Sequence, residues 1–204
     1  MYSTFIFDLD GTIIDSELMG LKSLQETLRG QGIEKGLDEL RFSLGIPGLR
    51  TLEILDIADI PTTLKSWAER EKPFMKNVPL FKGIIEVINQ LPKTGIVTSQ
   101  TTEEMQQGFY LLDIDQHFEK IICADHTQKH KPNPDPLELG LKLLGCCADE
   151  AIYIGDSIYD LKCAKSAGVG FGLAFWGTKT TSGFDDADYI FETPNDILKL
   201  LDKN

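Results

Sequence analysis

Two aspartates near the start of the chain have the types and spacing for chemistry on a phosphate or a metal. Asp8 and Asp10 directly follow a short apolar run, residues 4–7, which is typical of a buried strand. A spacing of two sends both carboxylates the same way from an extended backbone. Two like charges held close are costly unless a cation or a shared proton offsets them. The pair therefore predicts a divalent metal site with one carboxylate kept for chemistry, although a plain acidic turn after a strand also fits these residues alone.

Further polar side chains follow later apolar runs, at the point where each run ends. The carboxyl ends of parallel strands meet at one edge of a sheet, which is where ligands bind in open α/β folds. We therefore expect these side chains to lie together with the first two aspartates. They are Thr98 and Ser99, Lys131, and the acids Asp156 and Asp160.

Such a set of groups suits phosphoryl transfer. Carboxylates alone repel a phosphate, but Mg²⁺ bound to carboxylates and to a substrate phosphate removes that conflict. Asp8 and Asp156 are the expected ligands, and Asp10 would add its backbone carbonyl. Lys131 would supply a point charge and Thr98 a hydrogen bond to the transferring group.

The elements that must position these groups form an α/β pattern. From residue 82 onward, predicted helices at 83–91, 101–112, 136–144, 158–167 and 194–201 alternate with short apolar strands. The expected strands are 4–7, 95–98, 120–123, 151–155, 169–174 and 189–191. Strands joined by crossover helices indicate a Rossmann-like parallel sheet with helices on both faces.

The stretch between the first strand and residue 82 shows helical periodicity and no strand-like alternation. We expect a small all-helical cap inserted after the first strand. The predicted domains are an α/β core, residues 1–14 and 82–204, and a helical cap, residues 15–81. Trp67 is interpreted as part of the cap's own core, with a substrate platform as the alternative.

Composition limits the function classes. The 204 residues carry a formal net charge of −12 and show no basic cluster, which excludes a nucleic-acid partner. The apolar runs are too short to span a membrane, and we expect no signal peptide and a cytoplasmic location. The four cysteines lack metal-site spacing and are expected to be reduced thiols. The sequence does not determine the oligomeric state.

Four motifs resemble those of the haloacid dehalogenase-like hydrolases, in particular the phosphoglycolate phosphatase-like branch with a helical cap after the first strand. They occur in that family's order and span the chain. They are Asp8-Leu9-Asp10-Gly11-Thr12, Thr98 at a strand end, Lys131-Pro132-Asn133-Pro134 and Gly155-Asp156-Ser157-Ile158-Tyr159-Asp160. The second aspartate of the first motif argues against a dehalogenase.

The resemblance implies a role for each matching residue. Asp8 would be the nucleophile that forms an aspartyl-phosphate, and Asp10 the general acid and base. Thr98, with Ser99 beside it, and Lys131 would bind the phosphoryl group.

The same resemblance implies which residues bind the metal. Asp156 would bind Mg²⁺ directly, together with Asp8 and Asp10. Asp160 would orient the metal's ligands from outside, with a purely capping role as its alternative.

The function expected from the sequence is Mg²⁺-dependent hydrolysis of a small phosphomonoester, for which a phosphoglycolate-like metabolite is the model. One alternative is a phosphomutase of the β-phosphoglucomutase kind, which the Gly-Thr after Asp10 disfavours modestly. A second is a non-catalytic phosphate-binding or regulatory protein. Arg50, in a cap loop with two glycines and a proline, is a candidate for reading an anionic leaving group, and a solvated surface arginine is the alternative.

Overall fold

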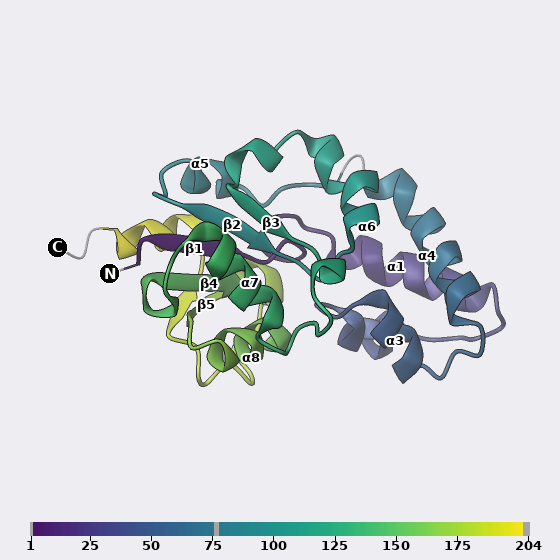
Figure 1. Ribbon diagram of the computed structural model, residues 1–204. Helices are drawn as coiled ribbons and strands as arrows, with labels where there is room; N and C mark the ends of the chain where they lie inside the picture. Colours follow the sequence, from purple (N-terminus) through teal and green to yellow (C-terminus); the bar gives the residue numbers. More distant parts are fainter. Residues whose placement is uncertain (1, 76–77, 202–204) are drawn as a thin grey trace.

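The computed structural model describes residues 2–75 and 78–201. A six-stranded parallel sheet forms the centre of the larger part of the molecule (Figure 1). Its order is β3-β2-β1-β4-β5-β6, so that β1 lies in the middle. The strands are β1 (Thr4–Phe7), β2 (Thr94–Val97), β3 (Lys120–Ile122), β4 (Ala151–Gly155), β5 (Gly170–Ala174) and β6 (Tyr189–Phe191). The predicted α/β class and parallel sheet are confirmed.

Helices cover both faces of this sheet, as two separate apolar clusters show. One cluster joins β1 to α5, α6 and the C-terminal 3₁₀ helix η6, and the other joins the opposite face to α7 and α8. Every residue of β1, β2 and β4 is buried, as expected for parallel strands covered on both sides. The α-helices are α5 (Ile84–Ile88), α6 (Thr102–Gln107), α7 (Asp135–Leu144), α8 (Ile158–Ser166) and α9 (Phe175–Thr178). The 3₁₀ helices of this part are η2 (Phe109–Leu112), η3 (Asp115–His117), η4 (Ala124–His126), η5 (Ala148–Glu150) and η6 (Pro194–Leu200).

A group of helices lies beside the sheet and beyond the carboxyl end of β1 (Figure 1). It has an apolar cluster of its own, built on leucines such as Leu24, Leu28 and Leu52. Its elements are α1 (Glu17–Arg29), α2 (Leu37–Leu40), η1 (Arg41–Ser43), α3 (Gly48–Ile54) and α4 (Ile60–Met75). We call this group the cap.

The two connections between cap and sheet run side by side. Ile14 and Leu80 form an antiparallel bridge, and the Asp15 backbone N–H donates to Pro79 O at 2.8 Å. A paired connection of this kind allows the cap to move as one body on two adjacent hinges.

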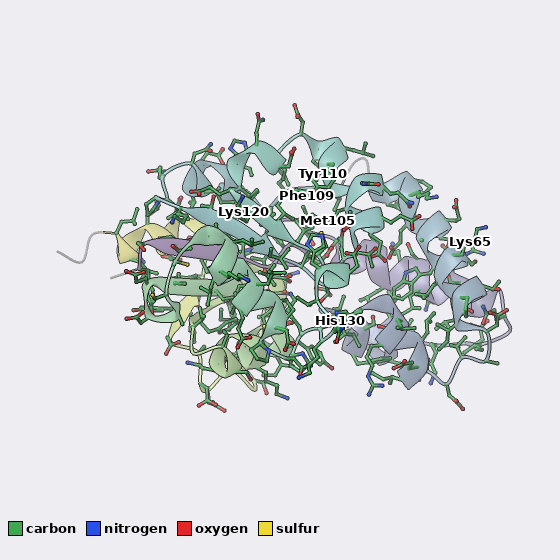
Figure 2. All side chains as sticks on the ribbon, in the orientation of Figure 1. Lys65, Met105, Phe109, Tyr110, Lys120 and His130 are labelled. Carbon is green, nitrogen blue, oxygen red and sulfur yellow. The ribbon has the colours of Figure 1, made fainter. Side chains whose placement is uncertain are left out.

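Three predicted helices differ in the structure: the helix expected at 83–91 is α5, which covers only Ile84–Ile88, the one expected at 194–201 is the 3₁₀ helix η6, and the one expected at 101–112 is interrupted. The pattern at 101–112 predicts a continuous helix, but α6 ends at Gln107 and a 3₁₀ turn follows. The backbone of Gly108, at φ −133° and ψ −83°, is not helical and separates the two. Met105 and Phe109 lie on either side of this break and are both buried in the apolar cluster on the sheet, while Lys65 is exposed on α4 (Figure 2).

Within the described residues, none of the helices is both long enough and apolar enough to cross a membrane.

Candidate active site

The side chain of Asp8, at the end of β1, is held by a lysine from a distant part of the chain. Asp8 is 2% exposed, and its Oδ1 accepts a hydrogen bond from Lys131 Nζ at 2.7 Å. Its backbone N–H donates to Ile154 O at 2.8 Å, which fixes it against β4. Within residues 2–75 and 78–201, Asp8 Oδ2 takes part in no hydrogen bond. One carboxylate oxygen is thus anchored and the other is free to attack.

Lys131 is the centre of a buried network. Its Nζ also donates to Asp160 Oδ1 at 2.8 Å and to the hydroxyl of Tyr153 at 2.9 Å. Burial alone would lower the pKa of Lys131, but the charges of Asp160 and Asp8 raise it above its usual value. The ammonium is therefore charged beside Asp8, where a transferring phosphoryl group would gather negative charge.

Asp10 is oriented by two neutral donors. Ser16 Oγ donates to Asp10 Oδ1 at 2.6 Å, and Gln100 Nε2 donates to Oδ2 at 2.8 Å. Burial raises the pKa of Asp10, while these two hydrogen bonds act in the opposite direction. A carboxyl with a raised pKa retains a proton that it can give to a leaving group.

Asp156, just after β4, gives this edge of the sheet the donors for a hard cation. Carboxylate oxygens of Asp8, Asp156 and Asp160 lie within 4.8 Å of one another. In the described part of the chain, Asp156 has no hydrogen-bond partner, and burial followed by the charges of Asp8 and Asp160 raises its pKa well above the usual value. A Cβ atom on Gly11, whose φ is +75°, would overlap the Asp156 carboxylate.

These residues fit Mg²⁺. Oxygen ligands with few hydrogen bonds of their own are what this ion needs, and a bound cation would offset the repulsion among the acids. Asp8 and Asp156 would hold it with their carboxylates. Asp160 is already committed to Lys131 and Tyr153, so it would act on the site through them.

Thr98 and Ser99 reach the same edge at the end of β2. Thr98 is buried, and its Oγ1 accepts a hydrogen bond from the Gln100 backbone N–H at 3.1 Å. Ser99 Oγ donates to Gly45 O at 3.1 Å, so it joins the core to a loop of the cap. Their contact with a phosphoryl group stays a prediction.

A cavity of about 150 Å³ lies between cap and core and opens onto Asp8 and Asp10. α1, α3 and α4 line it from the cap, and the start of α6 lines it from the core. Its side chains include Met19, Leu44, Leu64, Trp67, Glu71, Ser99, Gln100 and Glu104. Trp67 therefore contributes both to the cap's apolar cluster and to this cavity.

Arg50 lies elsewhere. It is on α3, its side chain is 63% exposed, and its Nη1 is 2.9 Å from Glu53 Oε2. It does not line the cavity, whereas Gly45 and Gly48 of the same loop do. Whether Arg50 meets a substrate stays a prediction.

Four residues of the site were not expected from the sequence: Ser16, Gly45, Gln100 and Tyr153. A phenol in an otherwise aliphatic buried strand was a usable signal for Tyr153. Ser16 and Gln100 carried no signal, because their contacts with Asp10 depend on how two loops fold back.

A parallel sheet with two neighbouring carboxylates and a buried lysine at one edge is typical of an enzyme that transfers phosphoryl groups. The family model described as "Haloacid dehalogenase-like hydrolase" matches residues 5–174. The chain belongs to the haloacid dehalogenase-like hydrolases. The family, the fold class and the assignment as a phosphatase enzyme are thus confirmed.

Particular relatives match over nearly their whole length. The chain is 32% identical to a protein of Caldanaerobacter subterraneus provisionally named pyrophosphatase PpaX, over 96% of this chain and 93% of that one. It is 29% identical to pyrophosphatase PpaX of Bacillus velezensis, over 97% and 95%. A Lactobacillus plantarum crystal structure, provisionally named a phosphoglycolate phosphatase, matches with a TM-score of 0.90 and 29% identity over 98% of this chain and 99% of that one.

Proposed function

We propose that this protein is a Mg²⁺-dependent phosphatase that hydrolyses a small phosphomonoester through an aspartyl-phosphate on Asp8. The observation that carries the proposal is the position of Asp8 between a charged lysine and an unpaired acid: Lys131 Nζ is 2.7 Å from its Oδ1, and Asp156 lies within the same carboxylate cluster. Family membership and the names of the relatives support the same reaction class.

In the first step, Asp8 Oδ2 attacks phosphorus and the bond from phosphorus to the leaving oxygen breaks. Asp10 gives its proton to that oxygen, and the alcohol leaves. Lys131 offsets the charge of the transferring group, and Thr98 would donate to it. Mg²⁺, when bound by Asp8, Asp156 and the Asp10 carbonyl, would supply further positive charge at the phosphate oxygens.

In the second step, the Asp10 carboxylate takes a proton from water. The water oxygen bonds to phosphorus, and the bond from phosphorus to Asp8 breaks. Inorganic phosphate leaves, and both aspartates return to their initial states. Closure of the cap over the cavity would exclude bulk water from the first step.

The charge of the leaving group can be compared with the charges that line the cavity. The names of the relatives point to pyrophosphate or phosphoglycolate, and phosphoglycolate was also the model expected from the sequence. Both have anionic leaving groups. Of the described residues that line the cavity, Lys72 is the one cation, and its Nζ is 2.6 Å from Glu69 Oε1.

The test is hydrolysis of p-nitrophenyl phosphate by purified protein, with Mg²⁺ and with excess EDTA. We expect turnover with Mg²⁺, none with EDTA, and none in Asp8→Asn. Asp15→Asn, which alters an exposed acid just after the motif that contains Asp8, is the control and should keep the activity. Turnover in Asp8→Asn equal to wild type would overturn the mechanism. Activity that requires a sugar bisphosphate would indicate a phosphomutase.

A further inference from the structure

The part of the cavity that would hold the leaving group is rich in hydrogen-bond acceptors. Glu71 of α4 and Glu104 of α6 both line it, and these two helices pack against each other. Among the residues that the structure describes, Glu71 makes no ion pair, and the indole N–H of Trp67 lies beside its carboxyl group and acts to lower its pKa. Burial, followed by the charges of Asp10 and Glu104, raises the pKa of Glu71 to about 8.

Two more acceptors share this space. Glu104 uses Oε2 to cap α6, accepting from the Thr101 backbone N–H at 2.6 Å and from the Thr101 hydroxyl at 2.8 Å. Its Oε1 has no partner in the described ranges. Gln100 Oε1 is buried and also unpaired, because Gln100 uses its Nε2 for Asp10. A ligand group with several N–H donors would satisfy these oxygens together.

There is also free space in the cap next to Glu71. A Cβ atom on Gly20 of α1 would lie 3.9 Å from Glu71 Oε1, so a larger side chain there would fill the space. Trp67, one turn before Glu71 on α4, lines the cavity with its indole ring. An indole face attracts cations through its quadrupole.

The two lysines of the site are each paired with acids. Lys131 is engaged at Asp8 and Asp160, and Lys72 is paired with Glu69. A second phosphate or a carboxylate placed here would meet two acids and no free cation in the described part of the cavity. Such a placement gains no favourable charge interaction, whereas an ammonium group would favour the ionised form of Glu71 and lower its raised pKa.

Resting on the proposed phosphatase function, we infer that the natural substrate is the phosphate ester of a small amino alcohol, whose ammonium group lies between Glu71 and Glu104. The ammonium would donate to Glu71, to Glu104 Oε1 and to Gln100 Oε1, and its methylene groups would contact Trp67. The ester oxygen would then lie towards Asp10, which protonates it as the amino alcohol leaves. The cavity of about 150 Å³ suits a substrate of this size.

The test compares kcat/KM for three substrates of similar size: O-phosphoethanolamine, n-propyl phosphate and phosphoglycolate. At the end opposite the phosphate, these substrates carry an ammonium cation, a neutral methyl group and a carboxylate, respectively. We expect wild type to prefer phosphoethanolamine over n-propyl phosphate by about tenfold to a hundredfold, the range for a hydrogen bond to a charged group. Phosphoglycolate should be the poorest of the three.

Glu71→Gln should remove most of this preference, which is measured as the ratio of kcat/KM for phosphoethanolamine to kcat/KM for n-propyl phosphate. Glu104→Gln is a second variant that retains the capping function, because glutamine also closes a capping box. Glu26→Gln is the matched control, since Glu26 is an exposed cap acid 3.7 Å from Arg70 and outside the cavity. It should keep the wild-type preference.

Three outcomes count against the inference in distinguishable ways. Hydrolysis of p-nitrophenyl phosphate together with a preference for phosphoglycolate or pyrophosphate would overturn it and leave the phosphatase function standing. A preference for phosphoethanolamine that persists in both Glu71→Gln and Glu104→Gln would also overturn the inference and leave the phosphatase function standing. Failure of wild type to hydrolyse any of these esters with Mg²⁺ would overturn the phosphatase function and the inference together.

Discussion

Lys131 Nζ donates to Asp8 Oδ1 at 2.7 Å, although the two residues are 123 positions apart in the chain. The same ammonium donates to Asp160 at 2.8 Å, and all three side chains are almost completely buried. One lysine thus compensates two acids that would otherwise repel each other in the interior. In the proposed mechanism, catalysis and folding depend on the same contact.

Replacing this lysine should therefore destabilise the protein strongly. Lys131→Met leaves two buried carboxylates without their cation, and breaking a buried pair in this way costs about 3–5 kcal/mol of unfolding free energy. Asp160→Asn in the same chain should recover part of that loss. Urea denaturation measures both values. Lys35→Met removes an exposed pair with Glu39 and should change stability by less than about 1 kcal/mol. Equal losses at the two lysines would contradict this account of the network.

Asp10 and Asp8 should be separable by trapping the intermediate. In Asp10→Asn, a substrate with a good leaving group still phosphorylates Asp8, but water then lacks the base that activates it. We expect more acid-stable phosphate on the quenched variant than on wild type, measured by mass spectrometry of the intact protein. Asp15→Asn should behave like wild type. An Asp10→Asn protein that traps no additional phosphate would show that Asp10 does not act in the second step.

Closure of the cap should depend on Gly45. This residue has φ +79°, its carbonyl accepts from Ser99, and a Cβ atom there would lie 2.7 Å from Ser157 Cβ. Gly45→Ala should hold the cap away from the core and lower kcat/KM for small esters by roughly tenfold, since about 1.4 kcal/mol of transition-state stabilisation corresponds to that factor.

Gly32→Ala is the matched control for this variant. Gly32 also has φ +79° and lies in the cap, but nothing lies within 4 Å of a Cβ atom there. In both variants an alanine must adopt a left-handed backbone conformation, so the free energy of unfolding falls by the same amount from this cause. If both lose the same activity, backbone strain and not contact with Ser157 is the cause.

Glu71 should make stability depend on pH. Its pKa is raised from 4.5 to about 8, with burial as the largest cause, so the folded state binds a proton that the unfolded state releases. The stability linked to this proton is complete below about pH 4.5 and is lost as pH rises to about 8. Glu71→Gln removes that dependence. The stability of the variant relative to wild type should rise between pH 5 and pH 8 in urea denaturation, and a constant difference would contradict the assigned pKa.

The residues of the proposed site were predictable because Asp8, Asp10 and Asp156 follow strands closely and Lys131 lies in the connection after β3. The alternation of short apolar runs and helices indicates a parallel sheet, and in such a sheet all strand ends meet at one edge. Asp8, Asp10, Lys131 and Asp156 could therefore be placed together from local pattern alone. The capping box Thr101-x-x-Glu104 was likewise local and is present in the structure.

The partners of these residues were not predictable in the same way. Tyr153 and Gln100 complete the network because loops and strands far apart in the sequence converge, and side-chain contacts at that range follow no sequence period. Gly45, and not Arg50, faces the core because the loop packs with its glycine against Ser157.

Local patterns in the sequence were enough to predict the fold class and the family and to indicate the acids and lysine of the proposed reaction, since strand periodicity and motif spacing are local properties of the chain. The tertiary structure alone decided which side chains surround the leaving group. In the sequence, Glu71 is one acid of a helical stretch and Glu104 is part of a capping box. Both line the same cavity only because α4 packs against α6.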